Sequence, residues 1–196
     1  MTEFDFAFTL FGLVLGLAMT EVLGGFVRVL KARSVRADED VAIRIGWHTP
    51  LLGLVITLDL ISFWLGAWEV RKGVPLDYAP LVFAALIAGV YYAAASLVFP
   101  DEPRQWPDVD DWFERHKRQV ALGIFAANFL FSFGEVLLYG TWSYSIISRL
   151  FQIFYLSLAV ALMFTRRGWQ SLTVLGLMLW VFTMLAVRPV IIAMMG

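Results

Sequence analysis

Polar side chains recur at helical spacing in two neighbouring hydrophobic stretches, 119–139 and 143–164. In both stretches the polar positions are three or four residues apart, which places them on one face of a helix. The first set is Asn128, Ser132 and Glu135, and the second set is Ser145, Arg149 and Gln152. We expect two polar faces on adjacent antiparallel helices to contact each other or to line a shared cavity.

Glu135 and Arg149 form the best-matched pair of opposite charges in these stretches. Each lies about seven residues from the centre of the turn, which is near Thr141 and Trp142. Both therefore sit at a depth of roughly 10 Å along their helices. One interpretation is an interhelical lock, a salt bridge with hydrogen bonds that contributes about 1 kcal/mol in a membrane. The other interpretation is a polar pathway that these residues line.

Three further ionisable residues, Glu21, Asp59 and Arg188, lie inside long apolar stretches. Charged groups within a membrane are costly, and they mark ion or substrate pathways or else pair as structural contacts. If all five charged residues face one interior, they form a ladder across most of the bilayer, and a desolvated carboxyl can exchange protons near neutral pH. In the structural alternative, Glu21 contacts a neighbouring side chain, Arg188 extends outward, and Asp59 pairs with Arg188.

The composition requires a bilayer as the solvent. The 196 residues are 60% hydrophobic and 16% charged, with a mean hydropathy of +0.76. Soluble domains are about 45–50% apolar and about 25% charged, so the polar residues here cannot cover the apolar ones. Membrane lipid is therefore an expected partner, and nothing beyond scattered loop cations points to nucleic acid.

Several kinds of chemistry are not expected from the residue types present. The chain has no cysteine, which excludes disulfides, thiolate metal sites and cysteine nucleophiles, and it has only two histidines. It contains no HExxH, G-x-S-x-G or P-loop motif. We therefore expect no cofactor, no metal site and no catalytic residue, and an enzyme is the least favoured class.

Six stretches are long and apolar enough to cross a bilayer, which needs about 20 helical residues. They are approximately 4–30, 46–68, 78–99, 119–139, 143–164 and 170–194. The predicted fold is an all-α polytopic bundle of six transmembrane helices in one domain, 1–196.

Positive charge is distributed unequally among the connections, and this predicts the orientation. The first, third and fifth connections carry most of the cations, namely Lys31, Arg33, Arg36, Arg44, Arg104, Arg115, Lys117, Arg118, Arg166 and Arg167. The second connection has only Arg71 and Lys72, and the fourth has none. These odd-numbered loops are predicted to be cytoplasmic, with both termini outside, in a bacterial inner (plasma) membrane.

The connection at 100–118 is the only loop whose sequence has distinctive features. Pro107 is placed to open a short helix, with Asp108, Asp110 and Asp111 at the positive end of its dipole. Trp112 gives this segment an apolar side. It is predicted to lie at the lipid headgroups or, as the alternative, to dock a cytoplasmic protein partner.

Small residues at four-residue spacing form two ridges, Gly12-Gly16-Thr20-Gly24 and Ala85-Gly89-Ala93. Such ridges allow helices to approach closely, so packing within the bundle and homo-oligomers are both plausible.

The leading functional hypothesis is a small transporter or channel for protons, cations or a small solute. Its exchanging carboxyls would be Glu21, Asp59 and Glu135, with Arg149 setting the charge of Glu135. The path would be lined by Asn128, Ser132 and Gln152, and Arg188 would be its last charged position. The alternative is a non-transporting membrane subunit or scaffold that engages a partner through 100–118.

Overall fold

The computed structural model describes residues 3–35, 43–70, 78–139 and 146–195, and these residues are almost entirely helical. The helices are α1 (Glu3–Val35), α2 (His48–Val70), α3 (Tyr78–Ser96), α4 (Val109–Tyr139), α5 (Ile146–Phe164) and α6 (Gly168–Met195), with one short 3-10 turn, η3 (Pro103–Gln105).

All six helices are long and apolar enough to cross a membrane, which confirms the predicted all-helical fold. Large apolar side chains remain exposed around the bundle, among them Leu13, Leu86, Leu122 and Phe133, each more than half exposed. Exposed apolar surface of this extent marks a membrane or an interaction surface. The six helices therefore indicate a multi-pass membrane protein.

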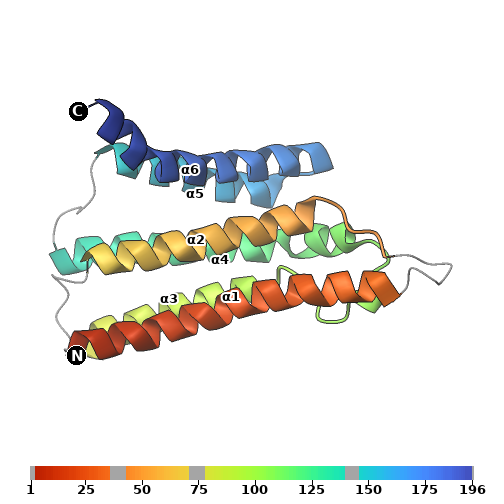
Figure 1. Cartoon of the computed structure of the whole chain (residues 1–196), viewed down its shortest axis with the longest axis horizontal. Helices are drawn as coiled ribbons and strands as arrows, with labels where there is room; N and C mark the ends of the chain where they lie inside the picture. Colours follow the sequence, from red (N-terminus) through yellow and green to blue (C-terminus); the bar gives the residue numbers. More distant parts are fainter. Residues whose placement is uncertain (1–2, 36–42, 71–77, 140–145, 196) are drawn as a thin grey trace.

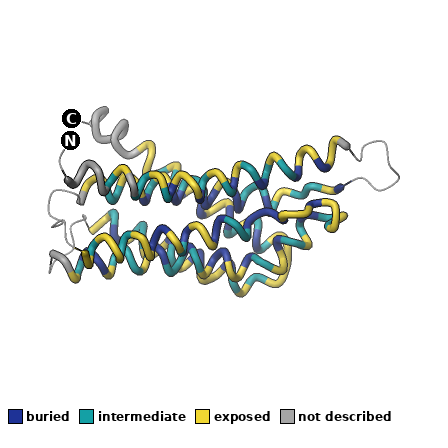
Figure 2. The backbone as a smooth tube through the Cα atoms, turned by 90° about the horizontal axis from the view of Figure 1, so that it is seen from below, coloured by how far each residue is buried: buried dark blue, intermediate teal, exposed yellow. Residues whose placement is uncertain are grey.

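The six helices pack as three neighbouring pairs, and the central pair contacts both outer pairs. Figure 1 shows α2 and α4 between the pair α1 and α3 and the pair α5 and α6. The contacts run α1–α3–α4–α5–α6–α2 and back to α1, and α2 also touches α4. Buried and exposed residues alternate along each helix (Figure 2). A larger share of α2 and α4 is buried than of the other four helices, so these two provide the most shielded positions.

The fourth helix begins at Val109 rather than at Gln119, so most of the segment expected to lie at the headgroups belongs to α4 itself. Its first turn carries Asp110 and Asp111, and the Asp108 carboxylate accepts a hydrogen bond from the Asp110 amide at 2.9 Å. An acceptor at this position satisfies an amide that has no partner within the helix. A helix therefore begins close to the predicted position, but it is not short: it continues to Tyr139.

The residues before and within the first turns of α4 pack into the bundle. Trp112 Nε1 donates a hydrogen bond to the Leu97 carbonyl at 2.9 Å, and Phe113 is 1% exposed. Arg44 pairs with the chain just before α4: its amide donates to the Pro107 carbonyl at 2.8 Å, and its carbonyl accepts from the Val109 amide at 3.0 Å. The approach to α2 is thus tied to the start of α4.

The remaining boundaries differ by a few residues from those predicted. The first helix extends to Val35, and the third ends at Ser96. The predicted turn between the fourth and fifth helices lies outside the described residues. The alternation of direction along six helices brings the start of α1 and the end of α6 to the same end of the bundle (Figure 1).

Candidate functional site

Asp59 lies at the centre of the bundle, near the middle of α2, and is 3% exposed. Its carboxylate accepts hydrogen bonds from two neighbouring helices. Tyr91 on α3 donates its hydroxyl to Oδ2 at 3.0 Å. Asn128 on α4 donates its amide Nδ2 to both carboxylate oxygens, at 3.2 and 3.0 Å, and the same nitrogen lies 3.1 Å from the Tyr91 hydroxyl.

A second tyrosine completes this cluster from a fourth helix. Tyr155 on α5 is 4% exposed, and its hydroxyl lies beside Asp59, beyond the geometry of a direct hydrogen bond. Among the described residues this hydroxyl has no hydrogen-bond partner. Buried tyrosine hydroxyls usually find a partner, and the Asp59 carboxyl is a polar group that lies beside this one.

Asp59 has no cation beside it within the described part of the chain. The ion pairs formed there by the acidic residues involve Glu21, Asp101, Asp108, Asp110, Glu114 and Glu135. The donors that reach Asp59 are a phenol and an amide, both neutral. A carboxylate held in this way keeps its full charge in a low-dielectric setting, which is costly.

Glu135 contrasts with Asp59 because an arginine compensates its charge. Arg149 Nη2 on α5 lies 3.2 Å from Glu135 Oε2, with the two side chains 6% and 2% exposed. This is the contact that their matched depths predict. The other carboxylate oxygen, Oε1, is buried without a hydrogen-bond partner among the described residues.

A chain of hydrogen bonds connects the Glu135–Arg149 pair to the Asp59 cluster. Arg149 Nη1 donates to Gln152 Oε1 at 2.6 Å, and Gln152 Nε2 donates to the Ser132 hydroxyl at 2.6 Å. Ser132 in turn donates to the Asn128 carbonyl at 3.0 Å, and the Asn128 side chain binds Asp59. We refer to these residues, with Tyr91 and Tyr155, as the central polar chain.

The structure brings together six of the eight residues singled out from the sequence: Asp59, Asn128, Ser132, Glu135, Arg149 and Gln152. Glu21 does not join them. Its carboxylate lies 3.5 Å from Arg28 on the same helix, and Arg28 also reaches Asp101 at 3.3 Å. The side chain of Arg188 lies outside the described residues, so a contact with Asp59 stays a prediction, as do the transport roles of all eight.

Tyr91 and Tyr155 are the members of the chain that sequence reasoning missed. Tyr155 follows Arg149 and Gln152 at a further three-residue step, so it extends the polar face already recognised on that helix. Tyr91 lies well inside an apolar stretch instead of at its end, where membrane tyrosines usually gather. That position was the available signal for a buried hydroxyl with a polar partner.

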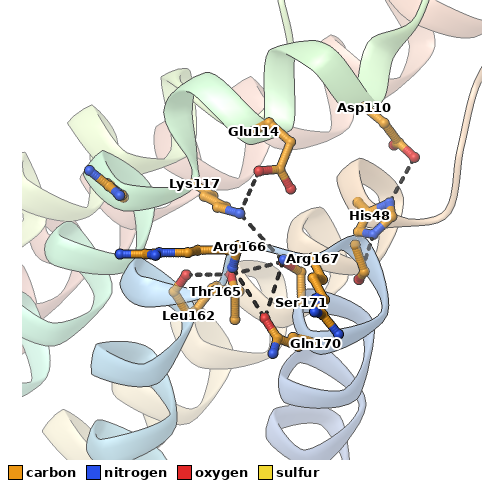
Figure 3. A network of polar contacts seen from close by, with 12 residues as sticks. His48, Asp110, Glu114, Lys117, Leu162, Thr165, Arg166, Arg167, Gln170 and Ser171 are labelled. Carbon is orange, nitrogen blue, oxygen red and sulfur yellow. Dashed lines mark hydrogen bonds and ion pairs between the residues drawn. The ribbon is translucent and has the colours of Figure 1, made fainter.

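A second polar network lies at the end of the bundle where α2, α4 and α6 begin (Figure 3). Lys117 on α4 is 3% exposed, and its Nζ lies 2.5 Å from Glu114 Oε2 and 3.5 Å from the Ser171 hydroxyl. At the start of α2, His48 lies 2.7 Å from Asp110. We refer to this group as the end network.

The two networks are separated by an apolar layer. Between Lys117 and Asn128, α4 turns Val120, Ala121 and Ile124 inward, all fully buried. Eleven residues of helix separate the two polar positions, a rise of roughly 16 Å. The central polar chain therefore reaches from Asp59 toward the end where α4 finishes. On the other side of Asn128, the buried side chains of α4 are apolar as far as Val120.

The described residues contain no group of three or more His, Cys, Asp or Glu side chains placed to hold a metal ion. No protein-family model, curated protein or solved structure matches the chain.

Proposed function

We propose that the protein is a small membrane transporter or channel that moves protons, with Asp59 as the carboxyl that binds and releases them. The observation that carries this proposal is that Asp59 is buried at the centre of the bundle without a cation among the described side chains. An isolated buried carboxylate costs several kcal/mol, whereas binding a proton removes the charge.

The surroundings of Asp59 favour a proton over a metal cation or a larger solute. The groups that touch the carboxylate are hydrogen-bond donors, the Tyr91 hydroxyl and the Asn128 amide. A hard cation needs several oxygen acceptors that converge on one point, and the Asn128 amide presents its nitrogen there. A proton needs only a carboxyl oxygen and a neighbouring group that can rotate to accept a hydrogen bond from the protonated carboxyl. The Tyr155 hydroxyl is such a group.

In this proposal, Arg149 blocks the proton path while it is paired with Glu135. A fixed positive charge repels protons and cations, and Arg149 lies between Glu135 and the polar groups that lead to Asp59. Passage then requires Glu135 to take up a proton and release Arg149. The unpartnered oxygen Oε1 of Glu135 is the atom that would receive this proton.

The test is proton flux into proteoliposomes under an imposed pH gradient and potential. The wild type should acidify the lumen faster than protein-free vesicles, and Asp59→Asn should lower the rate to that background. Glu21→Gln is the matched control, because Glu21 is a carboxyl on the same bundle that pairs with Arg28 away from the central polar chain. We expect it to leave the flux within about twofold of the wild type.

Two results would overturn the proposal. The first is the absence of flux above background for folded wild type at any gradient applied. The second is an unchanged flux in Asp59→Asn.

The alternative is a non-transporting membrane subunit that engages a protein partner through 100–118. Its support is the row of exposed charged residues on that segment, including Asp101, Arg104, Asp111 and Arg118. Trp112 and Phe113 are not free to form such a contact, since both pack into the bundle. Loss of flux in every preparation, together with capture of a partner that charge reversal at Arg104 and Asp111 abolishes, would favour this alternative.

The homo-oligomer, the bacterial inner membrane and the outward termini stay predictions. The ridge on α3 is exposed, with no atom of another residue within 4 Å of the Cβ position at Gly89. On α1, Gly16 is equally open. These surfaces face lipid or a second copy of the chain, and cross-linking through cysteines introduced at Gly89 distinguishes the two.

A further inference from the structure

His48 joins the first turns of three helices through its two ring nitrogens. The residue begins α2, and its Nδ1 lies 2.7 Å from Asp110 Oδ2 in the first turn of α4. Its Nε2 lies 3.0 Å from the carbonyl oxygen of Gly168, the first residue of α6. Figure 3 shows the ring between Asp110 and the start of the α6 helix. One side chain thus ties α2, α4 and α6 together at the end where they begin.

Two hydrogen bonds at this ring require one proton more than a neutral histidine beside an ionised carboxylate provides. A neutral imidazole carries one N–H donor and one bare nitrogen. Both partners of His48 are oxygen acceptors, a carboxylate and a backbone carbonyl. Both contacts can be hydrogen bonds only if the ring is doubly protonated or if Asp110 itself carries a proton and donates it to Nδ1.

We propose that the His48–Asp110 pair is a proton-operated latch that holds the start of α6. When the extra proton leaves to water, the one that remains stays between Nδ1 and Asp110, because a hydrogen bond to a carboxylate is the stronger of the two. Nε2 then presents a lone pair to the Gly168 carbonyl oxygen, and the two atoms repel. The contact with α4 survives, the contact with α6 breaks, and the N-terminal turn of α6 is released.

The geometry allows this exchange with water. The side chains of His48 and Asp110 are 16% and 24% exposed, so the pair is shielded but reachable. An imidazole ring can hold either one or two protons. The Phe113 ring covers one side of His48, with ring centroids 5.1 Å apart.

Other charged groups at this end have contacts of their own. They are Glu114 and Lys117 on α4, Arg44 before α2, Asp108 before α4, and Arg166 and Arg167 before α6. Glu114 pairs with Lys117, and Arg44 lies 3.9 Å from Asp108. Arg166 and Arg167 are exposed, and their amides donate to Gln170 Oε1 at 3.2 Å. Asp110 is therefore the charged group that contacts His48 directly.

Two glycines make room for the latch. A Cβ at Gly46 would lie 1.8 Å from Asp110 Oδ2, and a Cβ at Gly168 would lie 3.3 Å from His48 Nε2. Any side chain at Gly46 would displace the Asp110 carboxylate from its position beside His48. The close approach on both sides supports a site built around the pair, independently of the proton count and of the proposed function.

Because the chain contains no cysteine, introduced cysteines can be labelled specifically. Spin labels at Asp111→Cys on α4 and Thr173→Cys on α6, both exposed positions, report the separation of these helices in nanodiscs. We expect one narrow distance distribution at acidic pH and a longer component that grows as the pH rises, because loss of the proton breaks the contact with α6. The ratio of released to latched protein should rise by up to about tenfold per pH unit, as a one-proton step requires.

His116→Gln is the matched control. That histidine lies on α4, where its Nδ1 can donate a hydrogen bond to the Trp112 carbonyl oxygen at 3.0 Å. Because this contact stays within one helix, the removal of His116 should leave the pH response intact. His48→Gln should abolish the response. Distances that do not change with pH in the His48 protein, or that change equally in His48→Gln, would overturn the latch.

A second measurement keeps the unmodified residue. In His116→Gln, His48 is the only histidine, so ¹⁵N spectra of the ring report its protons directly. We expect hydrogens on both nitrogens, or one on Nε2 with a protonated Asp110, at low pH and a hydrogen on Nδ1 alone at high pH. A ring with one hydrogen, on Nδ1, across the whole range would contradict the proposal whatever the distances show.

Discussion

Lys117 in the end network and Asp59 in the central polar chain are buried to the same degree, but they differ in whether an opposite charge lies beside them. In the end network, Lys117 is 3% exposed and lies against Glu114. In the central polar chain, Asp59 is also 3% exposed, but the described residues place no cation beside it. Burial alone therefore does not mark a functional group in this bundle. The missing counter-charge is what distinguishes Asp59 from Lys117, and the proposed role of Asp59 rests on it, because a buried carboxylate without a counter-charge is costly.

The reach of the side chains explains part of this difference. Lys117 has a four-carbon stem that can carry its ammonium group to Glu114, which is nearly half exposed and partly hydrated. Asp59 has one methylene group and sits near the middle of α2. Its short side chain cannot extend to a cation at the surface of the bundle, so its immediate neighbours on α3, α4 and α5 surround the carboxyl.

The largest expected effect comes from breaking the compensated pair. Arg149→Met leaves the Glu135 carboxylate buried without a cation and should lower the free energy of unfolding by about 3 kcal/mol. Thermal unfolding in detergent measures this. The double variant Arg149→Met/Glu135→Gln should recover most of the loss, since it removes the stranded charge. A double variant no more stable than the single one would show that the pair contributes more than charge balance.

Asp59→Asn should separate stability from activity. The amide keeps the size and one acceptor oxygen and removes the uncompensated charge, so the free energy of unfolding should change by no more than about 1 kcal/mol. Proton flux in the same preparation should fall to background. A loss of stability as large as that of Arg149→Met would mean that Asp59 is a structural residue, and the contrast between the two carboxyls would fail.

Lys117→Met tests the end network in the same way. The methionine fills most of the volume of the lysine stem, and Glu114 can remain hydrated after its partner is removed. We expect a decrease in stability of less than about 1 kcal/mol, measured beside Arg149→Met under identical conditions. A decrease equal to that of Arg149→Met would mean that both ion pairs contribute equally to stability. The exposure of the acid, which is high for Glu114 and low for Glu135, would then not determine the effect.

The smallest effect on stability is expected from Tyr155→Phe. The hydroxyl has no partner among the described residues, so its removal should change the free energy of unfolding by less than about 0.5 kcal/mol. Tyr91→Phe removes a hydrogen bond to Asp59 and should cost about 1 kcal/mol. If the Tyr155 hydroxyl accepts a proton in transit, Tyr155→Phe should slow flux while Tyr91→Phe mainly lowers stability. Equal flux in both variants would assign no separate role to Tyr155.

The sequence predicted the parts of the site that depend on one helix or on one hairpin. Helical spacing identified Asn128, Ser132 and Glu135 as one face, and matched depth on two consecutive helices identified Arg149 as the partner of Glu135. Both inferences need only the rise and period of a helix.

Contacts between helices that are distant in sequence could not be predicted in this way. Asp59 meets Tyr91 and Asn128 because α2 and α4 pack together and α3 lies beside α4, and the lengths of the connections do not determine which helices become neighbours. The start of α4 was missed for another reason. Its first ten residues include several charged side chains, so a search for apolar stretches ends before it reaches them.

Its depth placed Glu21 in the ladder, whereas the structural alternative gave it a contact with a neighbouring side chain without naming that side chain. Arg28 lies seven residues further along the same helix, which is two turns and hence the same face. That spacing was sufficient to predict the ion pair and to separate Glu21 from the buried carboxyls.

The most direct test of the central claim is infrared difference spectroscopy of the protein in lipid at neutral pH. A protonated carboxyl has a C=O stretch that an ionised one lacks, and Asp59→Asn removes it if Asp59 is its source. We predict a band that is present in the wild type and in Glu21→Gln, shifts in deuterated water, and is absent in Asp59→Asn. A wild-type spectrum identical to that of Asp59→Asn in this region would show that Asp59 holds no proton at rest and would contradict its role as the exchanging carboxyl.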